Sequence, residues 1–414
     1  VIPIFKKVFK RYDALNESAE ENLAGIRVVK SFVNENFERQ KFDKASEELR
    51  EDFTAAERLM ALNSPFMNFT IYVLFVFILY FGSYLIVSSQ GTAFGVGQLS
   101  SLITYGFMML MALMMLSFVF AMIIIAEEGA RRICEVLLAT STINNPENPL
   151  TEVTDGSIDF ENVGFSYSGP EGREALSGVD LHINSGEVIG IIGGTGSAKS
   201  TLVQLIPRLY DVTAGSVSVG GHNVKDYDID TLRGAVAMVL QKNVLFSGTI
   251  KENLLWGNPD ATDEEILEAA RLAQADSFVQ TFPDKYETHI EQGGNNVSGG
   301  QKQRLCIARA LLRRPKVLIL DDSTSAVDTK TDSLIRSGLK DFLPDTTKII
   351  IAQRTSSIEE SDKIIVLDNG RVNAIGTHEE LLKDNPIYRE VYFSQNKQSV
   401  DENQSQEGEV TSHE

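Results

Sequence analysis

The sequence predicts a multi-domain membrane protein in which an α-helical transmembrane segment is followed by an α/β domain of the P-loop type. Three observations lead to this fold class. No charged residue or histidine occurs between Leu59 and Ala126, a stretch long enough for two membrane spans. A glycine-rich loop at 193–201 follows an apolar run that is typical of a buried parallel strand. Strands and helices then alternate, as in a mainly parallel sheet.

Composition excludes several other classes of protein. The 414 residues carry a net charge of −19, with a sequence pI of about 4.8, which argues against binding of nucleic acid through its phosphates. Cys134 and Cys306 lie far apart without the spacing of metal ligands, so neither a disulfide framework nor a zinc site is expected. Because the chain begins at Val1 and its first methionine is Met60, we expect a fragment or a processed product.

Residues 1–140 are predicted to be mainly helical. The first part, 1–58, has charges of both signs and apolar residues at helical spacing, which predicts long helices. Two apolar blocks, 66–87 and 102–126, each exceed the roughly 20 residues that span a bilayer core. We expect two transmembrane helices joined by a short turn, with both ends on the same side of the membrane. Residues 141–156 are then expected to form a linker.

A globular domain is predicted over 157–395, and the acidic tail 396–414 is predicted to be disordered. Within the domain, apolar runs predict strands near 158–163, 188–192, 317–320, 348–351 and 364–367. The order of these strands and the helices between them indicates an α/β sheet.

The glycine-rich loop has the composition of a phosphate-binding site. It consists of Gly193, Gly194, Thr195, Gly196, Ser197, Ala198, Lys199, Ser200 and Thr201. Backbone N–H groups and the start of the next helix face the phosphates, Lys199 reaches the β- and γ-phosphate oxygens, and the Ser200 hydroxyl ligates Mg²⁺. Ala198 stands where the loop usually has its last glycine. Its Cβ is tolerated in a right-handed helical conformation and clashes if φ is positive. We expect ATP affinity to survive this change.

Two further patterns carry chemistry. Asp321 and Asp322 end the apolar strand 317–320, and a carboxylate at the tip of a buried strand beside a phosphate loop is placed to hold Mg²⁺. The segment Ser298-Gly299-Gly300-Gln301 opens a helix, so that its N–H groups and the positive end of the helix dipole form a second phosphate site. Two such sites in one chain indicate that the second serves another nucleotide.

The order of these motifs resembles that of an ATP-binding cassette (ABC) half-transporter of the multidrug or lipid exporter type. Residues 157–395 resemble the whole nucleotide-binding domain of this family. Residues 1–140 resemble the last part of its transmembrane domain, including the final two spans, while the family's earlier spans are missing from the sequence. The segment near 34–41 resembles the coupling helix, which docks on a nucleotide-binding domain.

The resemblance also implies roles for single residues. Tyr167 resembles the aromatic residue that stacks on adenine, and Gln241 resembles the glutamine that touches Mg²⁺ and senses the transmembrane domain. The predicted metal ligands are Ser200, Gln241 and Asp321. Ser298, Gly299, Gly300 and Gln301 match the signature that clamps ATP held by the opposite subunit, with Val297 in place of the usual leucine. Ser325-Ala326-Val327-Asp328 matches a loop that crosses the dimer interface.

Two substitutions depart from the family's pattern at its catalytic groups. The catalytic base of the family is a glutamate after the Mg²⁺ carboxylate, and this chain has Asp322 there, whose side chain is one methylene shorter. The family's switch histidine is replaced by Gln353, which has no titratable proton. Since a base displaced by about 1 Å loses ~100-fold in rate, Asp322, Gln353 and Gln241 are predicted to form a slow catalytic site. ATP and Mg²⁺ are the expected substrate and cofactor.

We therefore expect the degenerate-site subunit of a heterodimeric exporter in the cell membrane, with its nucleotide-binding domain in the cytoplasm. Its partners would be a second half-transporter, membrane lipid and a small apolar or amphipathic substrate, and no nucleic acid. Hydrolysis would occur mainly at the composite site of the partner. Two alternatives stay open at this point. One is a homodimeric exporter with a slow ATPase that uses Asp322 as its base, and the other is a membrane-tethered, ATP-dependent scaffold.

Overall fold

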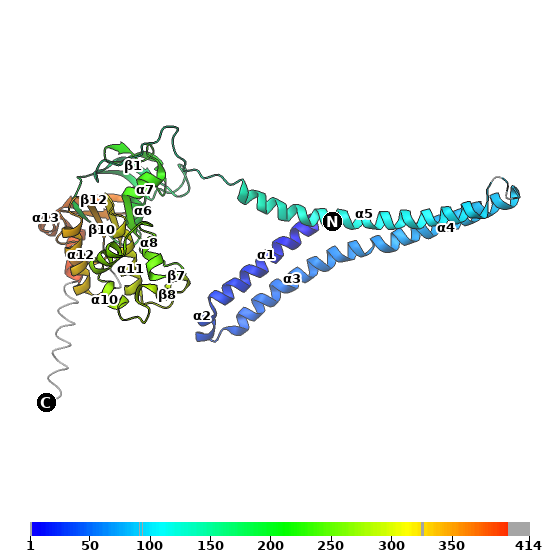
Figure 1. Ribbon diagram of the computed structural model, residues 1–414, viewed down its shortest axis with the longest axis horizontal. Helices are drawn as coiled ribbons and strands as arrows, with labels where there is room; N and C mark the ends of the chain where they lie inside the picture. The colour runs from blue at the N-terminus through cyan, green and yellow to red at the C-terminus, as the bar shows by residue number, and fades with distance from the viewer. Residues whose placement is uncertain (1, 91, 93, 324–326, 396–414) are drawn as a thin grey trace, which may run out of the picture. The chain divides into compact units, whose positions relative to one another are not determined.

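The computed structural model describes residues 2–90, 92, 94–323 and 327–395. The chain divides into two compact units, Val1–Thr140 and Ser141–Glu414, and each is described by itself. The helices of the first unit are α1 (Ile2–Ala24), α2 (Ile26–Ser31), α3 (Glu35–Ala61), α4 (Asn63–Ser88) and α5 (Val96–Leu137) (Figure 1).

The polar half of the first unit is a helical hairpin, in which α1 packs along α3 (Figure 1). Ion pairs bind the two helices together, with Lys7 Nζ 2.6 Å from Asp52 Oδ1 and Lys41 Nζ 2.5 Å from Glu21 Oε2. Lys7, Lys41 and Glu21 are exposed and Asp52 is 16% exposed, so each pair has at least one solvated partner and contributes little to stability. The short helix α2 lies at the bend between α1 and α3.

The predicted coupling helix near 34–41 lies in the first turns of α3, which begins at Glu35 after the N-cap Asn34. The separate short helix at the bend is instead α2, at Ile26–Ser31. Val33 has a positive φ of 52°, which turns the chain sharply between α2 and α3.

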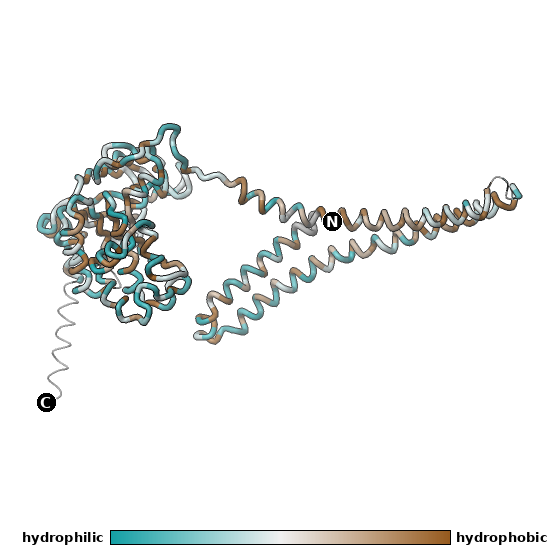
Figure 2. The backbone as a smooth tube through the Cα atoms, in the orientation of Figure 1, coloured by the Kyte–Doolittle hydropathy of each residue, from teal (hydrophilic) through white to brown (hydrophobic). Residues whose placement is uncertain are grey.

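The apolar half of the first unit is formed by α4 and α5. Two helical stretches in the described part of the chain, Glu35–Ser88 and Val96–Phe120, contain windows long and apolar enough to cross a membrane. Figure 2 shows hydrophobic residues along most of α4 and α5, whereas hydrophilic residues are frequent in α1 and α3. Most of these large apolar side chains are exposed in the isolated chain, as expected for helices that contact lipid.

Small residues let α4 and α5 approach each other closely. A Cβ on Gly82 of α4 would lie 2.5 Å from Leu99 Cδ1 of α5, and a Cβ on Gly106 of α5 would lie 3.0 Å from Phe75 Cε1 of α4. The rings of Phe75 and Phe107 then meet with centroids 4.7 Å apart. Close contact at small residues is how helices pack in a membrane, where burial of apolar surface from water gives no driving force.

The second unit is an α/β domain with two larger sheets. The six-stranded sheet has the order β12-β11-β3-β10-β9-β6, and the four-stranded antiparallel sheet has the order β2-β1-β4-β5. The strands of the first are β3 (Val188–Ile192), β6 (Val236–Val239), β9 (Val317–Asp321), β10 (Thr347–Ile351), β11 (Lys363–Asp368) and β12 (Arg371–Gly376). Those of the second are β1 (Ile158–Phe165), β2 (Leu176–Ile183), β4 (Ala214–Val219) and β5 (His222–Asn223). A two-stranded antiparallel sheet of β7 (Gly248–Thr249) and β8 (His289–Ile290) completes the set.

The helices of the second unit are α6 (Lys199–Gln204), α7 (Ile229–Ala235), α8 (Ile250–Leu255), α9 (Asp263–Leu272), α10 (Asp276–Val279), α11 (Gly299–Leu312), α12 (Thr329–Phe342) and α13 (His378–Asp384). Short 3₁₀ helices occur at Lys285–Glu287, Gln292–Gly294 and Thr355–Ser357, and residues 386–395 form a last helix. The predicted fold class, transmembrane helices followed by an α/β domain, is confirmed. The antiparallel sheet was not foreseen from the sequence.

Parallel pairing in the six-stranded sheet brings three loops to one edge. Ile351 of β10 pairs with Ile191 of β3 on one side and with Asp321 of β9 on the other. These strands are almost fully buried, so their carboxyl ends are held in register by both hydrogen bonds and packing. The segments that leave β3, β9 and β10 therefore emerge side by side, as ligand-binding segments do in open α/β sheets.

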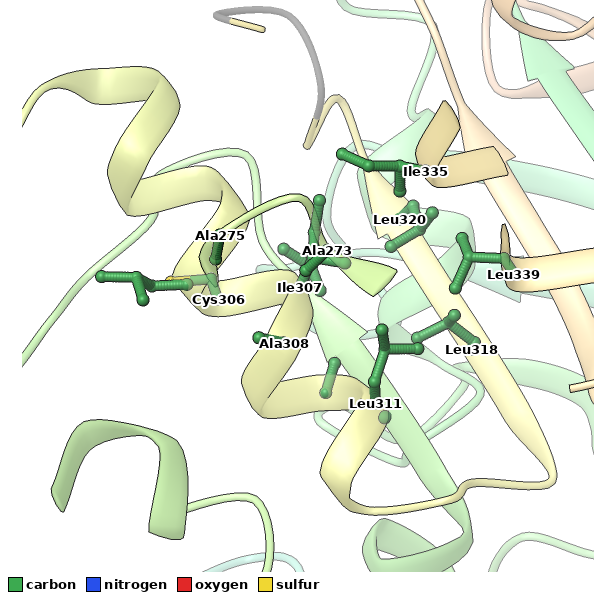
Figure 3. Packing of buried hydrophobic residues seen from close by; sticks show 14 of the residues in the cluster. Ala273, Ala275, Cys306, Ile307, Ala308, Leu311, Leu318, Leu320, Ile335 and Leu339 are labelled. Atoms are coloured by element: carbon green, nitrogen blue, oxygen red, sulfur yellow. The ribbon is translucent and has the colours of Figure 1, made fainter. Parts of the chain in front are cut away.

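Two hydrophobic cores fix this sheet on its opposite faces. In one, Ile307 and Leu311 of α11 and Ile335 of α12 belong to the same buried cluster as Leu318 and Leu320 of β9 (Figure 3). The other core fills the space between the two sheets and includes the buried face of α6. Alternate residues of β9 point into the two cores. A change of packing in either core therefore alters the position of the carboxyl end of β9.

Replacing Gly257 with alanine is expected to destabilise the second unit. A Cβ at Gly257 would lie 2.0 Å from the backbone oxygen of Arg309 in α11, so the helix would have to shift. Overpacking of this kind costs about 1–3 kcal/mol, which thermal unfolding in detergent would show as a lower Tm. Gly234→Ala is the matched control, because its Cβ would lie 3.8 Å from an Arg313 nitrogen. Equal Tm values for the two variants would contradict this packing.

Candidate functional site

A cleft of about 910 Å³ lies at the edge where β3, β9 and β10 end. Most of the residues predicted for the nucleotide site line it: Tyr167, Gly193, Gly194, Thr195, Gly196, Ala198, Lys199, Ser200, Thr201, Gln241, Asp321, Asp322 and Gln353. Ser197 is buried beneath the loop, where its hydroxyl oxygen lies 3.3 Å from Lys199 Nζ. A cleft of this volume is within the range of small-molecule sites.

The glycine-rich loop closes around its own lysine. Lys199 Nζ donates to the carbonyl oxygens of Gly193 at 2.8 Å and Gly194 at 2.9 Å. Burial lowers the pKa of Lys199, while the carboxylates of Asp321 and Asp322 oppose that shift. Gly193 is required sterically, because a Cβ there would lie 2.2 Å from the backbone oxygen of Leu367. An ammonium held at the mouth of a loop of N–H groups is suited to bind phosphate oxygens.

Ala198 adopts the conformation that its Cβ tolerates poorly. As the N-cap of α6 it has φ 70° and ψ 26°, which is the left-handed region. Of the two conformations considered for this position, the structure therefore has the one with positive φ. A non-glycine residue there costs roughly 1–2 kcal/mol, and the loop and α6 hold it in place. Gly196, also with positive φ, supplies a second left-handed turn in the loop.

Asp321 and Asp322 follow one another at the end of β9 but lie in different surroundings. Asp321 is 3% exposed, and burial raises the pKa of its carboxyl, an effect that a hydrogen bond from the Ser200 hydroxyl opposes. The nearby charge of Asp322 raises it further. A buried carboxylate beside a hydroxyl is an all-oxygen donor set of the kind that Mg²⁺ prefers, so the residues present fit that ion.

Asp322 is held between two glutamine side chains. Gln353 Nε2 donates to Asp322 Oδ2 at 2.7 Å, and Gln241 Nε2 donates to the same oxygen at 3.3 Å. The backbone of Asp322 is in the left-handed region with φ 48°, and its N–H donates to the oxygen of Ile351 at 3.0 Å. Burial raises the pKa of the Asp322 carboxyl, and the two amide donors oppose that shift.

One residue of an aromatic cluster, Tyr167, lines the cleft. Tyr167 is exposed and makes edge contacts with Phe165 and Tyr210, with ring centroids 4.9 and 5.3 Å apart. Its hydroxyl lies 3.0 Å from Thr201 Oγ1 in α6. The exposed ring face is available for stacking on a flat heterocycle. Stacking of Tyr167 on adenine stays a prediction.

Several lining residues were not foreseen from the sequence. These are Ser168, Arg173, Glu174, Ala175, Ile192, Ile351, Asn369, Gly370 and Val391. The Asn369-Gly370 turn was a detectable signal, since both residues have positive φ, 47° and 74°. Val391 comes from the last helix of the domain, and the sequence has no local pattern that places it at the cleft.

The second predicted phosphate site lies at the start of α11. Ser298 is the N-cap of this helix: its Oγ accepts from the Gln301 N–H at 3.3 Å, and its own N–H donates to Gln301 Oε1 at 2.9 Å. The hydroxyl hydrogen of Ser298 remains available to donate. Ser298 and Gly299 are exposed. Of the predicted interface loop, Ser325 and Ala326 lie outside the described residues, and Asp328 caps α12 by accepting from the Thr331 N–H at 2.9 Å.

Comparison with known proteins identifies relatives for both units. Residues 176–325 match the ABC transporter family model, and residues 2–113 match the model of the ABC transporter transmembrane region. An uncharacterized ABC transporter ATP-binding protein of Mycobacterium tuberculosis is 40% identical over 400 residues, which cover 95% of this chain and 68% of that protein. A putative multidrug export ATP-binding/permease protein of Staphylococcus aureus is 37% identical over 378 residues, covering 91% and 64%. Among solved structures, a bacterial Atm1-family ABC exporter with ATP bound has a TM-score of 0.84 at 29% identity, covering 95% of this chain and 70% of that one.

Ala198→Gly is expected to raise the Tm of the protein. Glycine adopts φ 70° without the Cβ penalty, a gain of about 1 kcal/mol that the entropy of the unfolded chain partly offsets. Thermal unfolding of the nucleotide-free protein measures it. Ala235→Gly, within α7, is the control and should lower the Tm, because there glycine replaces a good helix former. A fall in Tm for both variants would show that Ala198 is not strained.

Asp321→Asn is expected to raise the Tm of the nucleotide-free protein and to remove the further rise caused by Mg-ATP. Because burial raises the pKa of Asp321, its charged form destabilises the folded state at neutral pH. The gain should shrink as the pH falls toward this raised pKa, since protonation of the native carboxyl then removes the same charge. Thermal unfolding at neutral and mildly acidic pH, with and without Mg-ATP, tests both parts. A lower Tm at neutral pH without nucleotide would contradict the first part.

Proposed function

Because the chain belongs to the ABC transporters, we propose that it is the degenerate-site half of a heterodimer. It is an ATP-driven exporter subunit of the cell membrane, with its nucleotide-binding domain in the cytoplasm. Its own site holds ATP and cleaves it slowly. Its signature segment at Ser298–Gln301 completes the faster site of a second, different half-transporter. The observation that carries this proposal is the hydrogen-bonded group of Asp322, Gln353 and Gln241 at the end of β9.

The geometry of this group disfavours general-base catalysis. A base must reach a water molecule with a free lone pair. The Asp322 side chain is short, and its Oδ2 accepts from two amides at 2.7 and 3.3 Å. Gln353 is uncharged and cannot exchange a proton, so it offers γ-phosphate a hydrogen bond and no titratable group. Both features act on the cleavage step.

The groups that we propose hold the nucleotide line the same cleft. Tyr167 offers a stacking face, Lys199 an ammonium, and the loop its N–H groups. Asp321 and the Ser200 hydroxyl, with Gln241, would hold Mg²⁺, which neutralises charge on the phosphate oxygens when bound. A site with these groups and a weak base binds ATP more readily than it hydrolyses it.

The signature segment supports action on a nucleotide held elsewhere. Ser298 and Gly299 are exposed at the start of α11, and the Ser298 hydroxyl hydrogen is free to donate after the capping bonds are formed. In the proposed dimer these groups contact the ATP of the partner. The N–H groups of the first turn of a helix add favourable charge for a phosphate.

In this proposal the regions 1–140 and 157–395 act as the transmembrane and nucleotide-binding parts of the subunit, joined by the linker 141–156. We assign the coupling role to the bend formed by α2 and the turn that follows it. Phe32 and Val33 at this bend are 78% and 80% exposed, which suits docking on a nucleotide-binding domain of the assembled dimer.

We propose an apolar or amphipathic substrate. The two spans contain no charged residue, and exposed methionines on α5, including Met108, Met111 and Met115, offer a flexible apolar surface. The Staphylococcus aureus relative is named a putative multidrug exporter.

One observation favours the homodimeric alternative. Burial raises the pKa of Asp322, and a carboxylate with a raised pKa is a stronger base at neutral pH. A homodimer would then hydrolyse ATP slowly with Asp322 as its base. Purification separates the two: a single species with cooperative ATPase activity supports the homodimer, and dependence of activity on a second half-transporter supports the heterodimer.

The double substitution Asp322→Glu with Gln353→His is expected to raise ATP turnover by this site, by up to about 100-fold, because it restores the length of the base and a titratable switch residue. Steady-state ATPase assays of the reconstituted transporter measure the gain. Adding Lys199→Ala to the double variant should remove it, which shows that the gain arises in this cleft. Flat hydrolysis after the double change, together with fast hydrolysis by the unaltered protein alone, would refute the degenerate site.

A further inference from the structure

The end of the last helix contacts the loop that carries Gln353. Gln395 Nε2 donates to the backbone oxygen of Gln353 at 2.7 Å. Gln395 Oε1 accepts from the backbone N–H of Thr355 at 2.9 Å and from the Thr355 hydroxyl at 3.1 Å. One side-chain amide thus binds the loop on both sides of Arg354.

This contact satisfies groups that water does not reach. Thr355 is 2% exposed, so its N–H and hydroxyl depend on protein partners. Removing the acceptor would leave them unpaired, and an unpaired buried donor is costly enough to make the loop rearrange. The loop is fixed at its other end by α12, where Ser357 Oγ donates to Asp332 Oδ2 at 3.2 Å and Arg336 Nη1 donates to the Ser357 oxygen at 3.3 Å.

The last helix is itself firmly placed. Asn385 Oδ1 accepts from the Tyr388 N–H at 2.9 Å at the start of this helix. Tyr388 is fully buried, and its hydroxyl lies 2.7 Å from His378 Nδ1 in α13. Val391, one turn before Gln395, lines the nucleotide cleft. The helix therefore has a fixed start and reaches the cleft with its last turns.

We infer that Gln395 is a positioning residue of the ATP site: it fixes the backbone of Gln353 so that the Gln353 side chain faces Asp322. The end of the helix 386–395 thereby sets the geometry of the switch loop. The inference rests on the role proposed for the Gln353–Asp322 pair. We call the three hydrogen bonds of Gln395, to the backbone of Gln353 and to the N–H and hydroxyl of Thr355, the clamp. The clamp binds the backbone at 353, so it persists when the side chain there is changed.

Two variants of Gln395 separate the halves of the clamp. Gln395→Leu keeps the size of the side chain and removes all three hydrogen bonds. Gln395→Glu keeps the acceptor for Thr355 and replaces the donor to Gln353 with an oxygen that repels it. Ser394→Ala is the matched control, because the Ser394 hydroxyl donates within its own helix, to the oxygen of Val391 at 2.8 Å.

Hydrogen exchange of the full chain in nanodiscs tests the clamp without any need for turnover. Peptides covering 351–358 should exchange faster in Gln395→Leu than in the unaltered protein, because the Thr355 N–H loses its acceptor. Exchange in Gln395→Glu and Ser394→Ala should stay slow. Equal exchange in Gln395→Leu and Ser394→Ala would overturn the inference.

The rate of ATP hydrolysis, measured in the Asp322→Glu, Gln353→His background, tests whether Gln395 positions the loop that carries residue 353. Both Gln395→Leu and Gln395→Glu should lower kcat about tenfold and leave KM for ATP nearly unchanged, since the groups that hold ATP are untouched. Faster exchange with an unchanged kcat in an active background would make Gln395 merely structural and overturn the inference. If the background itself shows no turnover, the proposed function fails, and slower exchange in Gln395→Glu than in Gln395→Leu still supports the clamp.

Discussion

The site depends on the parallel register of β3, β10 and β9. Ile191, Ile351 and Asp321 lie side by side across these strands, so the segments that follow them leave the sheet together. A slip of one residue in either pairing would turn the carboxyl end of a strand toward the wrong core. The two hydrophobic cores prevent this, because alternate residues of each strand are buried on opposite faces. The phosphate loop, the carboxylates and Gln353 are thus brought together by packing far from the cleft.

The cleft also contains ionisable side chains whose charged forms are disfavoured by burial. The carboxyls of Asp321 and Asp322 have pKa values raised by burial, and the pKa of the Lys199 ammonium is lowered by it. Ala198 adds backbone strain at the entrance to α6. The buried charges destabilise the free protein, and a bound triphosphate with its cation would relieve them by supplying opposite charges and hydrogen-bond partners. Gln353, which donates to Asp322, is uncharged and adds no further charge to the cleft.

Local patterns in the sequence predicted much of the fold and of the site. The glycine-rich loop and Asp321 follow directly from short motifs, and the spans follow from the absence of charge. The conformation of Ala198 could not be predicted, because the pattern allows either sign of φ and tertiary packing selects the positive one. The coupling segment near 34–41 stays a prediction, and the separate short helix at Ile26–Ser31 was not predicted, since helix boundaries depend on the turn at Val33. Val391 reaches the cleft, and Gln395 reaches the backbone of Gln353 and Thr355, through the docking of a whole helix that no local sequence pattern predicts.

The central proposal is that this chain binds ATP and cleaves it only slowly. The most direct measurement is the ratio of ATP to ADP bound to this subunit after incubation with Mg-ATP, rapid removal of free nucleotide and acid quenching. We expect mainly intact ATP, because the carboxylate of Asp322 is short and hydrogen-bonded and the side chain of Gln353 is neutral. Replacement of Lys199 should abolish this retention. Bound ADP as the main species would show a competent hydrolytic site and contradict the claim.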